Sequence, residues 1–154
     1  ELGTGFKKAL ATLDGGRIGV AAQALGIAQG AIDRCKEYVT EHMRGERRIS
    51  QYQFTQFQLA DMQTKVDAAR FLVYRAAMAK QNGEPYGQYA AMAKLFASET
   101  AVDVARGCIE LAGYDGISKK YPFERFLRDA KITEIYEGTS EVQRMVISSS
   151  MGIK

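Results

Sequence analysis

The chain has 154 residues, of which 46% are hydrophobic and 25% are charged, and its formal net charge is +3. That length is enough for one domain with a real core, and the composition is typical of a globular protein rather than a disordered one. The charge is small and no dense basic run occurs, which argues against nucleic-acid binding. No apolar run approaches the roughly 20 residues that a membrane-spanning helix needs.

The cysteines and the single histidine argue against a disulfide scaffold and against a metal site. Cys35 and Cys108 lie far apart within apolar helical patterns, so we expect buried, reduced thiols. His42 stands alone and neither cysteine has metal-ligand spacing, so no metal is expected. The sequence starts at Glu1 rather than at a methionine, and we expect the chain to be part of a longer protein.

Residues 1–12, which contain two glycines, are predicted to be a linker from an upstream domain, and residues 13–154 a helical domain. Asp14 is the expected N-cap of a first long helix. The pattern of this helix fades in a polar connector at residues 43–48, and Ser50 is the expected N-cap of a second helix. The apolar positions of the first helix recur at spacings of three and four, the period of one helix face: Val20, Ala24, Ile27, Ala31, Cys35 and Tyr38.

Two further helical stripes follow the connector. The second ends at an Asn-Gly-Glu-Pro stop over residues 82–85, and the third ends at Gly113. A short helix is predicted over about residues 122–130, because proline suits a first helical turn, and a last one from residue 139 or 140 to about residue 149. The sequence therefore predicts an all-α fold, an antiparallel bundle of three long helices plus two short C-terminal helices. The two stripes are formed by Leu59, Met62, Val66, Ala69, Val73 and Ala76, and by Ala91, Leu95, Ser98, Val102, Ala105, Ile109 and Ala112.

Glu137 is the candidate catalytic residue that stands out from the sequence alone. It lies between two helical patterns and is flanked by the apolar Ile135 and Tyr136. A carboxylate that such neighbours partly desolvate becomes a stronger base. The alternative interpretation is a solvated turn glutamate that precedes the N-cap of the last helix.

Two other places could bind an anionic ligand. Asp14 and Arg17 flank a pair of glycines where the first long helix is expected to begin, and an arginine there could hold a phosphate or a carbonyl group. The alternative is a capping aspartate with a surface arginine. Gly113 could let the backbone approach a pyrophosphate, and the alternative is a plain helix-terminating turn.

Five blocks occur in order along nearly the whole chain: LDGGRIGVAAQALG at residues 13–26, QFQLADM at 56–62, AMAKLFASE at 91–99, YPFERFLRDAKI at 121–132 and IYEGTSEVQR at 135–144. With these blocks the chain resembles the C-terminal helical domain of the acyl-CoA dehydrogenase family, of the short- and medium-chain type. Five blocks in the right order are specific for that family, whereas none of them alone would be.

The resemblance implies a reaction and its catalytic residue. In this family FAD lies beside an acyl-CoA thioester, a glutamate takes the α-proton, the β-hydride passes to the flavin, and a trans-2-enoyl-CoA forms. Electrons then pass to electron-transfer flavoprotein. The Tyr-Glu-Gly-Thr motif that carries this glutamate maps onto Glu137, and Gly138 would let the acyl chain and the backbone approach closely. A thioester α-proton is a poor acid, so the carboxylate must act together with hydrogen bonds to the carbonyl oxygen.

The resemblance implies binding roles for further residues. Asp14 and Arg17 match the segment that contacts the CoA portion of the substrate. Thr139 and Glu141 match residues near the nucleotide end of the flavin. Gln53 occupies a position that the family uses on the flavin of a neighbouring subunit.

Two segments depart from the pattern of the family. After the first long helix the family usually carries Arg-x-Gln-Phe-Gly, where this chain has His-Met-Arg-Gly-Glu, and Arg44 is the expected replacement for the guanidinium. Further on, the family carries Gln-x-x-Gly-Gly, where Glu110 replaces the glutamine and Gly113 is the one glycine that remains. Both motifs bind the adenine dinucleotide across a subunit interface, and a carboxylate near a pyrophosphate is unfavourable unless paired. We therefore expect cross-subunit flavin binding to be weakened, remodelled or absent.

The resemblance as a whole implies a homotetrameric flavoprotein of fatty acid β-oxidation, in a bacterial cytoplasm or a mitochondrial matrix. Two alternatives remain open. The first is a non-catalytic assembly module that kept the bundle and lost the flavin. The second is an acyl-CoA oxidase, which shares the first half-reaction but gives its electrons to oxygen.

Overall fold

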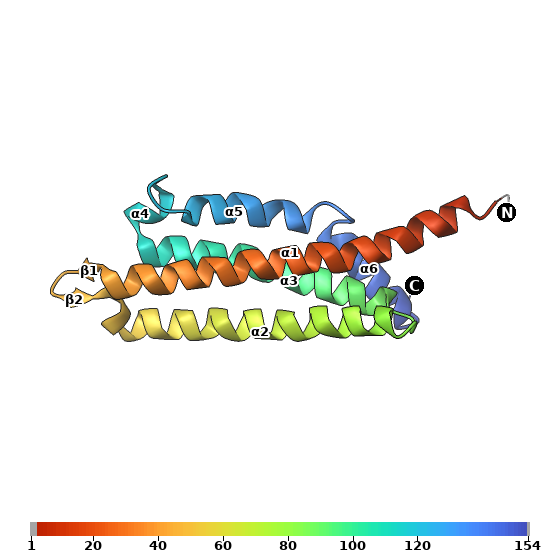
Figure 1. The fold of residues 1–154 in the computed structure, drawn as a ribbon, viewed down its shortest axis with the longest axis horizontal. Coiled ribbons are helices and arrows are strands. Elements are labelled where there is room, and N and C mark those ends of the chain that lie inside the picture. The colour runs from red at the N-terminus through yellow and green to blue at the C-terminus, as the bar shows by residue number, and fades with distance from the viewer. Residues whose placement is uncertain (1–2, 154) are drawn as a thin grey trace.

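Three long helices form an elongated bundle in the computed structural model, which describes residues 3–153 (Figure 1). They are α1 (Gly5–Glu41), α2 (Gln53–Gln81) and α3 (Gly87–Ala112). The chain runs along the bundle in α1, returns in α2 and runs forward again in α3, so each helix is antiparallel to the next one in sequence. The predicted all-α antiparallel bundle is confirmed.

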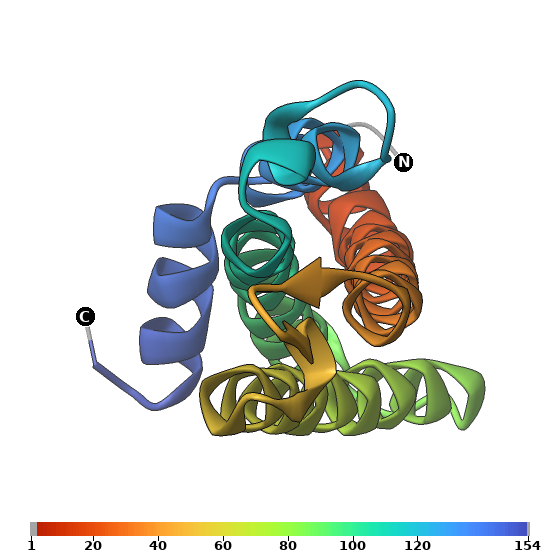
Figure 2. The ribbon, with the colours of Figure 1, turned by 90° about the vertical axis from the view of Figure 1, so that its left-hand side faces the viewer.

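Helix α3 is the centre of the bundle. It contacts α1, α2, α5 (Phe123–Lys131) and α6 (Ser140–Ser150), and the end-on view shows these helices around it (Figure 2). Short side chains at its buried positions let the neighbouring helices approach closely. Its fully buried alanines are Ala90, Ala91, Ala93, Ala97, Ala101 and Ala105.

The connector between α1 and α2 contains two short strands that the sequence did not predict. β1 (Met43–Arg44) pairs antiparallel with β2 (Arg47–Arg48), and the 3-10 turn η1 (Ile49–Gln51) follows. Strands of two residues are too short to show an alternating pattern. The prediction of Ser50 as an N-cap was wrong, because Ser50 lies inside η1 and the extended residue before α2 is Tyr52.

Helix α1 begins earlier than the sequence indicated. It starts at Gly5, so Asp14 is a residue of the helix interior and the prediction that it is an N-cap was wrong. Its carboxylate instead accepts a hydrogen bond from Arg17 at 2.6 Å. Most of the segment predicted as a linker is therefore helical. Its side chains are exposed, it extends beyond the bundle in Figure 1, and its role as a linker stays a prediction.

The C-terminal third follows the sequence prediction closely. Gly113 ends α3 with φ +63°, and α5 and α6 begin and end within two residues of the two predicted short helices. The one-turn helix α4 (Tyr114–Ile117) directly follows Gly113, and the 3-10 turn η2 (Ile132–Glu134) extends α5. Residues 135–139 then form the turn that leads into α6.

Cys35 and Cys108 are fully buried and unpaired, as predicted. The Cys108 Sγ lies 3.5 Å from the Ala31 carbonyl oxygen, where α1 and α3 meet. Within residues 3–153, no helix is long and apolar enough to cross a bilayer. The same range contains no group of three or more side chains placed to hold a metal ion.

Candidate active site

Glu137 lies in a left-handed turn between η2 and α6. Its φ is +56°, and Gly138 follows with φ +94°. A glutamate in this region is uncommon and costs free energy of order 1–3 kcal/mol. Such a conformation persists where the surrounding structure holds it, so the contacts of this turn decide what the turn does.

The side chain of Glu137 is half-buried and points onto α1, where it lies over Gly16. A methyl group built on Gly16 would stand 2.8 Å from the Glu137 Cδ atom, and one on Gly15 would stand 3.0 Å from the Lys80 Nζ atom. Each glycine costs a helix interior about 1 kcal/mol relative to alanine. The glycine pair therefore makes room on α1 for side chains that arrive from other elements.

Arg17 directly follows Gly16 on α1, the residue over which the Glu137 carboxylate lies. Its side chain is only 7% exposed, and its guanidinium is paired with Asp14 at 2.6 Å. The Arg17 Nε is buried without a partner among the described residues. The carboxylate of Asp14 in turn rests against the start of α3, where a methyl group on Gly87 would be 3.1 Å from its Oδ2. Asp14 and Arg17 thus lie on the segment of α1 over which the Glu137 carboxylate lies, and their role in substrate binding stays a prediction.

Lys94 and Gln143 complete the turn, and the sequence analysis had not assigned either of them to the site. Both side chains are fully buried. Lys94 Nζ donates to the Gly138 carbonyl oxygen at 2.7 Å, and Gln143 Nε2 donates to the same oxygen at 2.9 Å. Burial lowers the pKa of Lys94, whose neighbouring charges include Glu134 and Arg17. One signal was available: Lys94 occupies the buried stripe of α3 at helical spacing from Ala91 and Ser98.

Thr139 and Glu141 lie at the start of α6, directly after the turn. Thr139 is the extended residue before the helix, and Glu141 is in the first helical turn. The pKa of Glu141 is lowered, first by a hydrogen bond from its own backbone N–H and then by one from the Thr139 side chain. An acidic side chain that satisfies helix N-terminal donors is a common stabilising arrangement.

The remaining predicted cofactor residues lie at the opposite end of the bundle. Arg44 Nη2 donates to the Leu111 carbonyl at 2.8 Å, and a methyl group on Gly113 would stand 3.6 Å from the same nitrogen. Both line a hollow of about 420 Å³, and Gln53 begins α2 nearby with an exposed side chain. At a rise of 1.5 Å per residue, α1 separates Arg17 from Arg44 by roughly 40 Å. The structure thus divides the predicted cofactor set between two ends.

An aromatic cluster supports this second end. The Tyr38 hydroxyl donates to Asp115 Oδ2 at 2.9 Å, and the Tyr38 ring stacks on His42 with 4.0 Å between ring centroids. His42 Nε2 in turn lies 2.8 Å from the Tyr121 hydroxyl. Burial, followed by the hydrogen bond and charge of Asp115, raises the pKa of Tyr38 to about 12. The cluster ties α1 to α4 and to the segment before α5.

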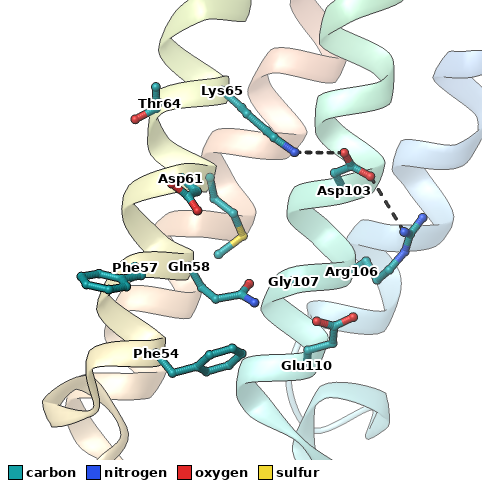
Figure 3. A pocket seen from close by; sticks show the side chains of 11 residues that line it. Phe54, Phe57, Gln58, Asp61, Thr64, Lys65, Asp103, Arg106, Gly107 and Glu110 are labelled. Atoms are coloured by element: carbon teal, nitrogen blue, oxygen red, sulfur yellow. Dashed lines mark hydrogen bonds and ion pairs between the residues drawn. The ribbon is translucent and has the colours of Figure 1, made fainter.

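A larger hollow of about 640 Å³ lies between α2 and α3, away from Glu137 (Figure 3). Phe54 and Glu110 lie at one end of it, and the ion pair of Lys65 with Asp103, at 3.2 Å, crosses the other. This groove is open and of mixed polarity, and no carboxylate in it is held by buried donors. The turn at Glu137, with its buried cations and strained backbone, is therefore the stronger candidate for chemistry.

Comparisons with known proteins agree with these features. The family model described as "Acyl-CoA dehydrogenase, C-terminal domain" matches residues 3–152. A short-chain specific acyl-CoA dehydrogenase of Clostridium acetobutylicum is 52% identical over 149 residues, which cover 97% of this chain and 39% of that protein. The solved butyryl-CoA dehydrogenase of Megasphaera elsdenii superposes with a TM-score of 0.96 at 49% identity, over 98% of this chain and 39% of that one.

A third match comes from a solved structure of the electron transferring flavoprotein of Acidaminococcus fermentans. One chain of that structure gives a TM-score of 0.96 at 53% identity and covers 98% of this chain and 40% of its own length. The bundle and its site thus define a C-terminal helical domain of the dehydrogenase type. The chain belongs to the acyl-CoA dehydrogenase family, and it spans about two fifths of the length of the curated relatives that it matches.

Proposed function

We propose that this chain is the C-terminal part of an FAD-dependent acyl-CoA dehydrogenase, in which Glu137 removes the α-proton of an acyl-CoA thioester. The observation that carries the proposal is the left-handed turn from which the Glu137 carboxylate lies over Gly16, the residue that precedes the buried Arg17. A general base needs a fixed position relative to the proton that it takes. The turn provides such a position at an open edge of the bundle.

The chain's own residues would act in three ways. Glu137 accepts the α-proton, and the electron pair of that C–H bond becomes the second bond of the α,β double bond. When bound, FAD supplies the acceptor for the hydride that leaves the β-carbon. Arg17, held in place by Asp14, would donate hydrogen bonds to an anionic portion of CoA on the substrate side of α1. Gly138, with φ +94°, continues the left-handed turn that carries the base.

The two groups of predicted cofactor residues fit a dinucleotide shared between subunits. Thr139 and Glu141 lie next to Glu137 at one end of the bundle, whereas Arg44 and Gly113 line a hollow at the other. One cofactor held at Glu137 does not reach both ends, so the distant end would serve the cofactor of a second subunit. Gln53, exposed at the start of α2, would contribute to that same contact.

Exposed apolar side chains on α2 support assembly into a homotetramer. They are exposed on the surface of α2, and a monomer seldom leaves so many aromatic groups in water. We expect the purified chain to self-associate. Light scattering that shows only monomer at high concentration would contradict this. The side chains are Phe54, Phe57, Phe71, Tyr74 and Met78.

Electron-transfer flavoprotein is the proposed electron acceptor. The proposal rests on the family of the chain and on its similarity to a chain in the solved structure of the Acidaminococcus fermentans flavoprotein. The test is reoxidation of the substrate-reduced enzyme by electron-transfer flavoprotein under anaerobic conditions. Rapid reoxidation by oxygen instead would indicate the oxidase type.

A non-catalytic assembly module is the second candidate, and Glu110 is the observation that favours it. Its exposed carboxylate stands close to the end of α3 at which the dinucleotide contact is proposed.

Flavin titration of the purified chain alone should show no tight stoichiometric binding, because half of the site would be missing. Tight binding to the isolated chain would contradict the shared-site geometry.

The decisive test uses the full-length protein of which this chain is a part. Acyl-CoA thioesters of increasing length are added without oxygen, and the flavin absorbance is followed. The dehydrogenase proposal predicts bleaching with at least one chain length and formation of the enoyl-CoA. A full-length protein that contains no flavin, or whose flavin no acyl-CoA reduces, would support the assembly module.

A further inference from the structure

Two buried donors hold the backbone of the turn that carries Glu137. Lys94 Nζ, at 2.7 Å, and Gln143 Nε2, at 2.9 Å, both donate to the Gly138 carbonyl oxygen and so occupy both of its lone pairs. Gln143 Nε2 also lies 3.3 Å from the Glu137 carbonyl oxygen. The donors come from different elements, α3 and α6, so the turn is fixed from two sides.

The cost of this arrangement indicates that it does more than fill space. Lys94 is fully buried on α3, where nearly all other fully buried residues are small or apolar, and burying an amine is unfavourable unless it is hydrogen-bonded. The Gln143 Oε1 is buried without a partner among the described residues. The Gln143 amide thus donates to the turn while its own carbonyl oxygen lacks a hydrogen bond, which is unfavourable. Packing alone would favour apolar side chains at both positions.

The absence of a side chain at Gly138 makes room for the Gln143 amide that donates to its carbonyl oxygen. A methyl group at this position would stand 2.8 Å from Gln143 Nε2 and 3.3 Å from Val142 Cγ1, and its φ of +94° also favours glycine. A side chain at this position would therefore displace the Gln143 amide. The backbone of the turn and its two donors form one fitted unit.

We propose that Lys94 and Gln143 are positioning residues for the base: by holding the Glu137 and Gly138 carbonyls inward, they keep Glu137 left-handed and its carboxylate over Gly16. This inference rests on the proposed function of Glu137. Neither side chain touches the reacting atoms, because both are enclosed by α3, α6 and the turn. Without them the strained turn relaxes toward ordinary φ values, and the carboxylate moves away from the substrate's α-carbon.

The test replaces each donor by a side chain of similar length without a donor, in the full-length enzyme. Lys94→Met and Gln143→Met remove one hydrogen bond each, and Lys36→Met, at an exposed position on α1, is the matched control. We expect a fall of about 100-fold in kcat for either variant, because a base misplaced by about 1 Å loses that much. KM should change by less than about twofold, since substrate binding is untouched. The control should match the wild type.

Two further readouts separate positioning from a merely structural role. The α-deuterium isotope effect on flavin reduction should increase in both variants, because proton removal becomes slower than the other steps. Crystal structures of the variants should show Glu137 out of the left-handed region while the bundle and the bound flavin are unchanged. A rate loss that instead follows lost flavin or a lowered melting temperature would overturn the inference, and so would wild-type kcat in both variants.

The variant Glu137→Gln distinguishes a failure of the proposed function from a failure of the positioning role of Lys94 and Gln143. If that variant is inactive and the two methionine variants are fully active, only the positioning inference fails. If Glu137→Gln retains wild-type activity, the proposed function fails and the positioning inference fails with it. If either methionine variant does not fold, the other carries the test alone.

Discussion

The carboxylate of Glu137 lies over Gly16, so close that a methyl group on Gly16 would stand 2.8 Å from the Glu137 Cδ atom. The two residues are far apart in sequence, and only the packing of the C-terminal turn against α1 brings them together. The contact is with the end of a flexible side chain. A larger residue at position 16 would therefore move the carboxylate rather than disrupt the helix.

Gly16→Ala should separate activity from stability. The added methyl group displaces the Glu137 carboxylate, so we expect kcat to fall about 10- to 100-fold. Alanine is the better helix former by up to about 1 kcal/mol, so the melting temperature should stay the same or rise. Steady-state kinetics and thermal unfolding of the full-length enzyme measure the two effects.

Gly19→Ala is the matched control for this prediction. Gly19 lies in the same helix, three residues away, and a methyl group there meets nothing within 4 Å. This variant should keep wild-type activity and gain a similar amount of helix stability. Equal activities for the two alanine variants would show that the Glu137 carboxylate does not need its position over Gly16.

Tyr38 should make the helical domain sensitive to high pH. Its pKa is raised from 10.0 to about 12 by burial and then by Asp115, so the unfolded state loses this proton first as the pH rises. The stabilisation is fully present below pH 10 and is lost between pH 10 and 12, by at most about 3 kcal/mol. In urea unfolding, the free energy of unfolding of the wild type should therefore exceed that of Tyr38→Phe by less at pH 11 than at pH 9. A difference in the free energy of unfolding that does not change with pH would contradict the burial of the Tyr38 hydroxyl.

Lys94 should give the opposite dependence on pH. Its pKa is lowered by burial, so the unfolded state holds this proton more tightly than the folded state. The free energy of unfolding therefore rises with pH, from the lowered pKa of the folded state up to the usual lysine pKa near 10.5. Urea unfolding between pH 7 and 10 should show the wild type gaining stability relative to Lys94→Met. A relative loss over this range would mean that Lys94 is not buried as described.

The two cysteines should be protected until the protein unfolds. Cys35 and Cys108 are both 0% exposed, and the hydrogen bond with the Cys35 thiol, followed by burial, raises the pKa of Cys108. A thiol-alkylating reagent should therefore leave both unmodified in the native protein and modify both in denaturant, as read by peptide mass mapping. Rapid modification of either one under native conditions would show that the contact between α1 and α3 opens.

The three long helices could be predicted because their apolar residues repeat with the helical period over many turns. The start of α1 could not, since Gly15 and Gly16 resemble a helix break in sequence. In the folded chain they lie inside the helix, and side chains from other elements occupy the space that they leave. The β1–β2 hairpin was missed for a different reason: its two-residue strands carry no periodic signal.

The candidate site was predictable only in part. The motif around Glu137 and the substrate-side role of Arg17 were inferred from the family resemblance. The turn's left-handed backbone was not, because φ at a glutamate cannot be read from sequence. Lys94 and Gln143 occupy helix faces that are otherwise buried, and a polar residue on such a face was the only sign of their contact with the turn. The role of these two polar residues becomes clear only in the structure, in which both donate to the Gly138 carbonyl oxygen.

The most direct test of the account is the rate of flavin reduction by acyl-CoA in Glu137→Gln, measured without oxygen in the full-length enzyme, with the exposed Glu37→Gln as its control. The glutamine keeps the shape of the side chain and cannot take the proton. We predict that acyl-CoA still binds while the reduction rate falls by roughly 10²- to 10⁴-fold, the usual contribution of a general base, and that the control is unchanged. Reduction of the Glu137→Gln flavin at the wild-type rate would contradict the assignment of Glu137 as the base.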